Sequence, residues 1–295
     1  METVNAPRSA GVVWSFVLFA LLWSAAPDAV FSQWVEAPGK GWLQVSLYHH
    51  DTRDRFDTQG NVEPLFNEGG RSITTSVFLT GVVGVYRGVD VWGQLPIHRL
   101  AFNDVSATRE SFGFGDPLLH VRVSPELFGV RSPVPIAIRG GVKLPLGEFP
   151  VDSEIVPLTE GQRDWELMLE LGHSFYPAPL YVMGWVGYRW RETNFEIDRK
   201  PGDETFAFFA IGGNRDKLSW KLSAEGIFGE QWISLTGVRI PLAMSERELV
   251  QITPTLGWQL GQGSIELGAR IPVAGQNLPA GPAIFLGYFM RLGKN

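Results

Sequence analysis

Residues Lys217–Phe228 read KLSWKLSAEGIF, a stretch in which polar and apolar side chains alternate. The odd positions from 217 to 225 are Lys, Ser, Lys, Ser and Glu, whereas the even positions from 218 to 228 are Leu, Trp, Leu, Ala, Gly and Phe. Successive side chains of a β-strand point to opposite faces, so the stretch predicts a ribbon with one polar and one apolar face. Repeated behind an export signal, this pattern is typical of an outer-membrane β-barrel.

The N-terminus carries the features of such an export signal. Arg8 precedes the apolar run Gly11–Trp23, and small residues near Ser32 offer a cleavage position. The run is too short for a membrane-spanning helix, which needs about 20 residues. We therefore predict a signal peptide at residues 1–32 and one barrel domain at residues 33–295; an uncleaved anchor or a buried helix is the alternative.

The composition narrows the class of protein. Hydrophobic residues make up 44% of the chain, yet no later segment is long and apolar enough for a spanning helix, so a helical membrane protein is excluded. Cysteine is absent, which excludes disulfides and thiolate metal sites. The net charge of -6 is spread without a basic stripe, so nucleic acid is not an expected partner. No cofactor is expected.

The fold class predicted is all-β: a transmembrane antiparallel up-and-down β-barrel of about twelve strands. Each predicted strand is close to the ~9–11 residues that cross a bilayer when tilted. The strands are expected at 42–50, 73–86, 89–99, 116–124, 135–145, 165–175, 180–191, 204–213, 217–228, 249–260, 264–273 and 283–292. The segment Gln231–Met244 also contains alternating residues, which leaves fourteen strands as an alternative.

Short and long links alternate between these strands. The short links are rich in Gly, Pro, Asn and Asp and lie near residues 87–88, 128–129, 176–179, 214–216 and 261–263. The long links are 51–71, 100–115, 147–164, 192–203, 229–248 and 274–281. This alternation predicts short turns and both termini in the periplasm, long loops outside, and a location in the outer membrane of a Gram-negative-type bacterium.

The polar face of each strand is assigned to the barrel interior. Eight strands already give an interior that side chains just fill, so an apolar lumen of about twelve strands would leave a large cavity. An Arg or Lys on the lipid face at mid-bilayer costs about 2–4 kcal/mol. The predicted lumen-lining residues are Asp90, His98, Asp116, His120, Arg122, Arg139, Lys143, Glu166, Glu170, Arg189, Lys221, Glu225, Glu266, Arg270 and Arg291, with Gln94, Gln251, Thr253 and Gln259 at the same parity. Such charges either pair across strands and hold the barrel closed, or select a solute.

The last predicted strand resembles the insertion signal of outer-membrane barrels. Gly287, Met290 and Leu292 fit its Gly-x-x-apolar-x-apolar core, although three residues follow and the usual terminal aromatic is missing. Partners expected from this reading are outer-membrane lipid, the barrel-insertion machinery acting through this strand, and an unidentified small solute.

A family resemblance rests on Gly113-Phe114-Gly115-Asp116 and Leu144-Pro145-Leu146-Gly147. A Gly-Phe-Gly-Asp opening a strand, followed by a hairpin that ends in apolar-Pro-x-Gly, resembles outer-membrane proteins of the family named for a MetA pathway of phenol degradation. The resemblance implies a barrel that passes small, often hydrophobic or aromatic molecules, and it supplies no catalytic residues.

Elementary chemistry assigns this motif a structural role. Gly113 and Gly115 are expected to adopt torsions that other residues avoid. Asp116 is expected to accept hydrogen bonds from the turn or to pair with Arg122 or Arg139. No phosphate-binding loop follows the glycines.

An enzymatic function receives little support. His173 and Ser174 are neighbours on a strand and point to opposite faces, so they do not form a nucleophile-base pair. Glu166 and Glu170 are about 13 Å apart at the rise of a strand, beyond the ~6.5–9.5 Å of inverting glycosidases. The pair His49-His50 with Asp51 is the remaining metal-ligand candidate, although paired His at a strand end are more often interfacial.

Two functions therefore stay open. The first is a passive channel or transporter for small, hydrophobic or aromatic solutes, whose loops 51–71 and 147–164 constrict the mouth. The second is a closed structural or binding barrel; a lipid-modifying enzyme ranks below both.

Overall fold

The computed structural model describes residues 35–65, 69–104, 107–146, 155–236 and 246–293. The predicted signal peptide lies outside these residues. No helix in the described part of the chain is long and apolar enough to cross a membrane.

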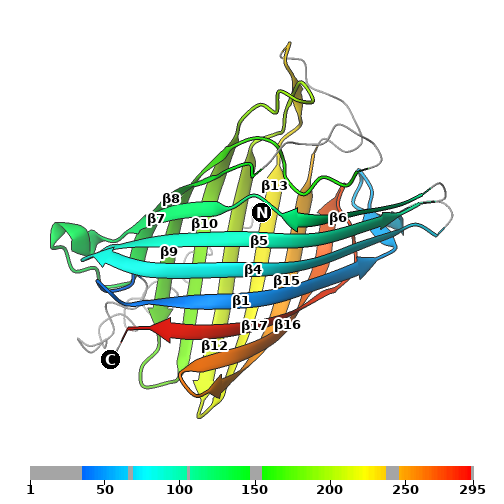
Figure 1. The fold of residues 1–295 in the computed structure, drawn as a ribbon. Coiled ribbons are helices and arrows are strands. Elements are labelled where there is room, and N and C mark those ends of the chain that lie inside the picture. Colours follow the sequence, from blue (N-terminus) through cyan, green and yellow to red (C-terminus); the bar gives the residue numbers. More distant parts are fainter. Residues whose placement is uncertain (1–34, 66–68, 105–106, 147–154, 237–245, 294–295) are drawn as a thin grey trace, which may run out of the picture.

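The main sheet closes on itself as a barrel (Figure 1). The sheet has thirteen strands. One of them, β6, pairs only with the outer half of β5. The other twelve form an antiparallel ring, in which β1 pairs with β17 on one side and with β4 on the other. The twelve are β1 (Gly41–Thr52), β4 (Arg71–Tyr86), β5 (Val89–Asn103), β7 (Leu118–Val123), β8 (Ile136–Lys143), β9 (Asp164–Ser174), β10 (Leu180–Arg191), β12 (Glu204–Arg215), β13 (Leu218–Gly229), β15 (Glu248–Leu260), β16 (Gly263–Gln276) and β17 (Ala283–Leu292). The predicted twelve-stranded barrel is confirmed.

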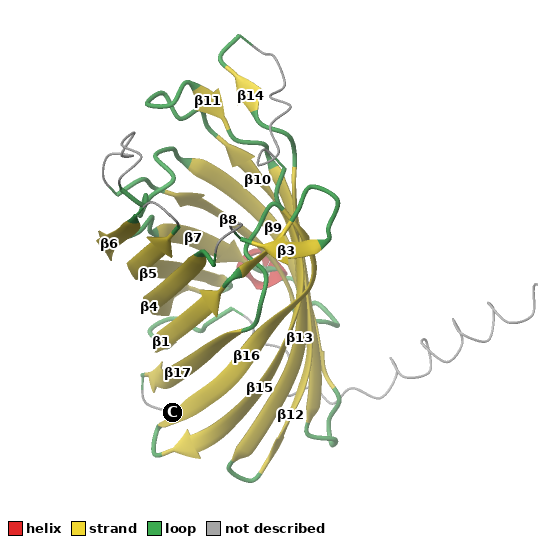
Figure 2. Cartoon of the chain, turned by 90° about the vertical axis from the view of Figure 1, so that its right-hand side faces the viewer, coloured by secondary structure: helices red, strands yellow, loops and turns green. Residues whose placement is uncertain are grey.

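Short links lie at one end of the barrel, which we call the turn end, and long links lie at the other, the loop end. Turns at the turn end use positive backbone φ at Gly88, Gly129, Asp216 and Gly261, and the 3-10 helix η1 (Pro125–Phe128) lies in one of them. At the loop end, the hairpin of β2 (Asp54–Phe56) and β3 (Val62–Pro64) lies across the opening. The pair β11 (Arg199–Lys200) and β14 (Ile233–Ser234) projects beyond the barrel (Figure 2).

The outer surface carries the apolar residues of the alternation. On β13, Leu218, Trp220 and Leu222 are exposed, and the same holds for Leu43, Val45 and Leu47 of β1. This is the apolar band expected of a barrel in lipid.

Aromatic residues mark both ends of this band. Trp165 and Trp190 are register partners near the loop end, while Trp220, Trp258 and Tyr288 lie near the turn end. Trp190 is ten residues from Leu180 along β10 (190 − 180). At 3.3 Å per residue and a tilt of ~40°, that interval covers about 25 Å, the usual height of the lipid-facing band.

The region 100–115 differs from prediction. Instead of a loop, β5 continues to Asn103 and pairs with β6 (Thr108–Phe114). Polar residues such as Arg99 and Glu110 obscure the strand in the sequence, because they form a cross-strand ion pair of 3.3 Å on the exposed face.

Two further expectations were wrong. Gly113 and Gly115 do not have positive φ. They are needed for close approach, since a Cβ on Gly115 would overlap the ring of His98 and one on Gly113 would lie 2.9 Å from Leu158 Cδ1. The fourteen-strand alternative also fails: β14 has two residues and pairs with β11 outside the barrel, and residues 237–245 lie outside the described chain.

Candidate functional site: the barrel interior

A first group of charges, the turn-end cluster, lies across β5, β7, β8 and β9. Arg122 Nη2 lies 2.6 Å from Asp90 Oδ2, and its Nη1 lies 3.3 Å from Glu170 Oε2. Arg139 Nε lies 2.8 Å from Glu170 Oε1. The backbone N–H of Glu36 donates to Asp90 Oδ2 at 2.8 Å, so the chain before β1 reaches this cluster. Asp90 is fully buried, and its charge is matched by direct hydrogen bonds.

An aromatic stack borders the turn-end cluster. The guanidinium of Arg139 lies 5.7 Å from the ring of Trp92 and 5.6 Å from that of Trp185. Trp185 in turn stacks on Phe208 with ring centroids 3.8 Å apart and planes 9° from parallel. The cation is therefore held by ring faces as well as by Glu170.

A second group, the loop-end network, is built on β7, β9, β10 and β12. Glu166 Oε2 lies 2.7 Å from His120 Nε2, and Glu166 Oε1 lies 2.5 Å from Arg189 Nη2. Arg189 Nη1 also lies 2.6 Å from Glu204 Oε2. Glu204, which is fully buried, additionally contacts Arg191 and Arg247. Removing one charged member would leave its buried partners with less compensating charge.

The link between β8 and β9 enters this network through Glu160. Its carboxylate contacts Lys143 and lies 2.9 Å from both Arg191 Nη2 and Arg247 Nη1. Burial favours the neutral acid, but Arg247, Arg191 and Lys143 outweigh burial and hold the pKa of Glu160 well below its ordinary value of 4.5. The N–H of Glu160 donates to Asp116 Oδ2 at 2.9 Å. One residue thus ties the link to β8, β10 and the start of β15.

Asp116 pairs with a different cation from those expected. Its Oδ2 lies 3.6 Å from Lys143 Nζ, not beside Arg122 or Arg139. The reason is its position: β7 begins only at Leu118, so Asp116 lies in the link at the loop end, level with the end of β8. Lys143 also lies 2.6 Å from the fully buried Asp164.

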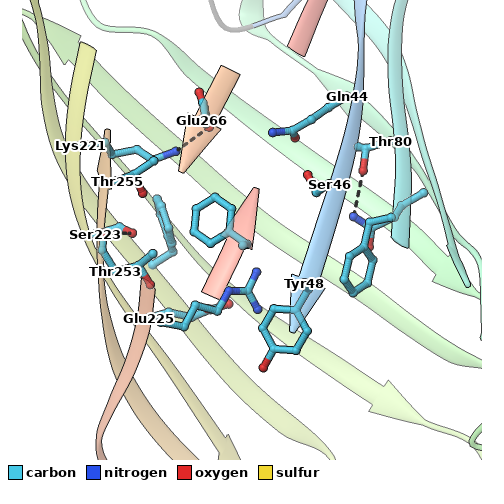
Figure 3. Close-up of a pocket in the computed structure, with 15 residues that line it drawn as sticks. Gln44, Ser46, Tyr48, Thr80, Lys221, Ser223, Glu225, Thr253, Thr255 and Glu266 are labelled. Atoms are coloured by element: carbon cyan, nitrogen blue, oxygen red, sulfur yellow. Dashed lines mark hydrogen bonds and ion pairs between the residues drawn. The ribbon is translucent and has the colours of Figure 1, made fainter. Parts of the chain in front are cut away.

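The opposite side of the interior contains a cavity of about 340 Å³ (Figure 3). Most of its lining comes from β1, β4, β13, β15, β16 and β17, and β5 and β12 contribute one residue each. Its lining combines hydroxyl and amide groups with four aromatic rings and four charged groups. The lining residues are Gln44, Ser46, Tyr48, Phe78, Thr80, Gln94, Phe208, Lys221, Ser223, Glu225, Thr253, Thr255, Glu266, Arg270 and Phe285.

Charges around the cavity are held loosely. Lys221 Nζ and Glu266 Oε2 face each other at 4.0 Å (Figure 3). Glu225 accepts a hydrogen bond of 2.6 Å from Gln251 Nε2. Arg270 lies 5.3 Å from the ring of Tyr48.

Two predicted lining residues lie outside these groups. His98 Nδ1 and Ser76 Oγ are 2.7 Å apart on neighbouring strands. Arg291 is exposed near the end of β17 and belongs to neither the charge groups nor the cavity lining.

The sequence-based prediction omitted five members of the loop-end network. Asp164, Arg191 and Glu204 lie at strand ends and face the interior. The alternation that predicts Glu166 and Arg189 to face inward also applies to them. Glu160 and Arg247 lie in links, where no two-residue period applies.

The residues weighed for catalysis have structural contacts. His49 Nδ1 lies 2.9 Å from Thr75 Oγ1, and the ring of His173 packs edge-on against Phe175 at 4.8 Å. Within residues 35–293, excluding the undescribed gaps, no group of three His, Cys, Asp or Glu side chains is arranged to hold a metal ion.

Comparison with known proteins establishes the fold. No family model matches the chain, so the resemblance to the phenol-degradation family is not confirmed, and no curated protein matches it. An outer membrane channel from Pseudomonas putida F1 is similar over 91% of this chain and 100% of its own, with 14% identity and a TM-score of 0.70.

Two other solved structures have lower TM-scores. The CymD monoaromatic hydrocarbon channel matches 88% of this chain and 90% of its own at 8% identity and a TM-score of 0.40. A FadL homologue from Pseudomonas aeruginosa matches 86% and 89% at 8% identity and 0.36. The Pseudomonas putida channel thus carries the fold comparison: the chain is a transmembrane β-barrel of the outer-membrane type.

Proposed function

We propose that the protein is a passive channel in the outer membrane of a Gram-negative-type bacterium for small solutes with an apolar or aromatic body. The observation that carries the proposal is the cavity inside the barrel, bordered by rings, hydroxyls and loosely held charges. Ligand sites combine apolar surface with a few polar groups in this way.

Passage is assigned to one side of the interior. The turn-end cluster and the loop-end network fill the side from β5 to β12 with paired charges, and Glu160 holds the link between β8 and β9 against that side. Lys221, Glu225, Glu266 and Arg270 are therefore the predicted lining residues that we propose to meet the solute. The remaining candidates act by holding the wall.

The outer surface supports the proposed surroundings. The apolar band and its aromatic ends fit outer-membrane lipid. We propose that the barrel-insertion machinery recognises strand β17 through Gly287, Met290 and Leu292.

Single-channel conductance of the refolded chain in a planar bilayer under a salt gradient tests the proposal. We expect discrete steps and, in Lys221→Glu, a reversal potential shifted toward cations, because the cavity loses a cation and gains an anion. Arg199→Glu makes the same charge change in β11, outside the barrel, and should leave selectivity within error of the parent.

One result would contradict the channel, and another would contradict the proposed path through the cavity. An inserted barrel without conductance would favour a closed structural or binding barrel. Conductance steps with the same ion selectivity in the parent and in Lys221→Glu would mean that the ion path does not pass Lys221.

A further inference from the structure

We propose that the cavity is a binding site for a small aromatic carboxylate, whose carboxylate is held by Arg270. This inference rests on the proposed function and names the chemical class of its solute.

Arg270 differs from the other interior arginines in its partners. Arg122, Arg139, Arg189 and Arg191 each lie within 4.0 Å of a carboxylate. In the part of the chain that the structure describes, no ion pair or hydrogen bond is formed by Arg270. Its contact is with the face of Tyr48, which leaves the guanidinium N–H groups available. A planar guanidinium matches a carboxylate through two parallel hydrogen bonds.

The acidic side chains of the cavity are already engaged. Gln251 donates to Glu225, and Lys221 faces Glu266. Lys221 offsets the charge of Glu266, and the amide of Gln251 donates to Glu225 Oε2 at 2.6 Å without changing its charge. Arg270 is the cavity cation that has no carboxylate within 4.0 Å among the described residues, so it is the anchor for an added anion.

A hydroxyl elsewhere in the cavity lining provides a second polar contact. Thr255 of β15, opposite Lys221 in the strand register, lines the cavity and is 5% exposed, and its Oγ1 has no hydrogen-bond partner within the described residues. Buried hydroxyls are normally paired. A ligand oxygen that reached Thr255 would supply the missing acceptor.

The apolar part of the ligand is set by the rings. Tyr48, Phe78, Phe208 and Phe285 border the cavity, and Phe208 is fixed by its stacking on Trp185. Rings packed against rings favour an aromatic body. A volume of about 340 Å³ is at the lower end of ligand pockets, which fits a single-ring compound.

Titration of the refolded, detergent-solubilised protein with 4-fluorobenzoate, followed by ¹⁹F NMR, tests the site without requiring conduction. The neutral probe 4-fluorobenzamide has the same ring and nearly the same shape. We expect benzoate to bind at least ~10-fold more tightly than benzamide, and Arg270→Gln to remove that preference, which corresponds to about 1.4 kcal/mol. Arg291→Gln removes the same charge outside the cavity and should keep the preference.

Each outcome decides the inference separately from the channel. Equal binding of both probes, or an unchanged benzoate preference in Arg270→Gln, would overturn the carboxylate site while leaving conductance intact. A benzoate preference lost in Arg270→Gln and kept in Arg291→Gln would support it even in a barrel that shows no conductance. If Arg270→Gln fails to fold, Thr255→Val with Phe285→Leu provides the readout, and weaker benzoate binding in both variants is expected.

Discussion

The two sides of the barrel interior handle charge in opposite ways. From β5 to β12, arginines and lysines meet carboxylates at distances mostly below 3.5 Å, and Asp90, Asp164 and Glu204 are fully buried. From β13 round to β4, hydroxyls, amides and rings surround a cavity, and the nearest ion pair is 4.0 Å long.

The difference shows how one barrel of fixed width can have one side filled by side chains and another side that leaves a cavity. Twelve strands enclose more space than ordinary side chains fill. Long ionic side chains in contact across strands fill one side, and their mutual pairing makes the burial tolerable. Shorter hydroxyl residues on the other side leave room, so the free volume gathers where the charge density is low.

The largest expected difference between the two sides concerns stability. Glu204→Gln keeps the shape of the side chain but removes the charge that Arg189, Arg191 and Arg247 share. We expect a loss of about 3–5 kcal/mol in the free energy of unfolding, because three cations are left with less compensation. Urea titration of the protein in lipid vesicles measures it.

Glu225→Gln makes the same chemical change on the cavity side. Its hydrogen bond is to neutral Gln251, so the cost should stay below about 1 kcal/mol. Equal losses in both variants would mean that the two sides do not differ in how they depend on charge.

A second difference is expected in how tightly the two sides are packed. A Cβ on Gly141 would overlap the ring of His120 and displace it from Glu166, so Gly141→Ala should cost about 1–3 kcal/mol. A Cβ on Gly287 would lie 3.2 Å from Gln44 Nε2 and 3.4 Å from Ser46 Oγ, both at the ends of side chains that can move.

We therefore expect Gly287→Ala to change the free energy of unfolding by less than about 1 kcal/mol. The same vesicle assay compares the two alanines. A Gly287→Ala variant as damaged as Gly141→Ala would show that the cavity wall is packed as closely as the network.

The period-two pattern explains why the fold was predictable. Every outward Leu and Trp of β13 and every inward Lys, Ser and Glu follows from counting by two along one strand. The same count brings Arg139 and Arg270 to the interior without distinguishing them. Their roles depend on cross-strand register, which sets Arg139 beside Glu170 of β9 and Arg270 over Tyr48 of β1.

The two-residue period does not apply to the links between strands. Glu160 belongs to a segment predicted as a loop, and nothing in its neighbours along the chain indicates three cations around it. Those cations come from β8, β10 and the residue before β15, 17 to 87 positions away. Only the closed barrel brings them together.

On the charge-filled side, the smallest expected effect concerns the link held by Glu160. About a third of this side chain is exposed, so solvent screens its ion pairs and Glu160→Gln should cost only ~1–2 kcal/mol. Its pKa is lower in the folded protein than in the unfolded chain. The stabilisation is therefore fully present above the unfolded value of about 4.5 and is lost only as pH falls through the folded value.

A spin label on the link reads this directly. Because the chain has no cysteine, Ile155→Cys, at an exposed position of the same link, gives a single attachment point. In the parent we expect label motion to stay restricted from pH 8 to below pH 4.5, and to increase as pH falls through the lowered pKa of Glu160, where the carboxylate takes up a proton and releases Arg191 and Arg247. With Glu160→Gln the label should be mobile across the whole range. If label mobility is the same in the parent and in Glu160→Gln and does not change with pH, the three cations do not hold the link. The hydrogen bonds of the Glu160 backbone with Asp116 and Asn194 would then hold it against the wall.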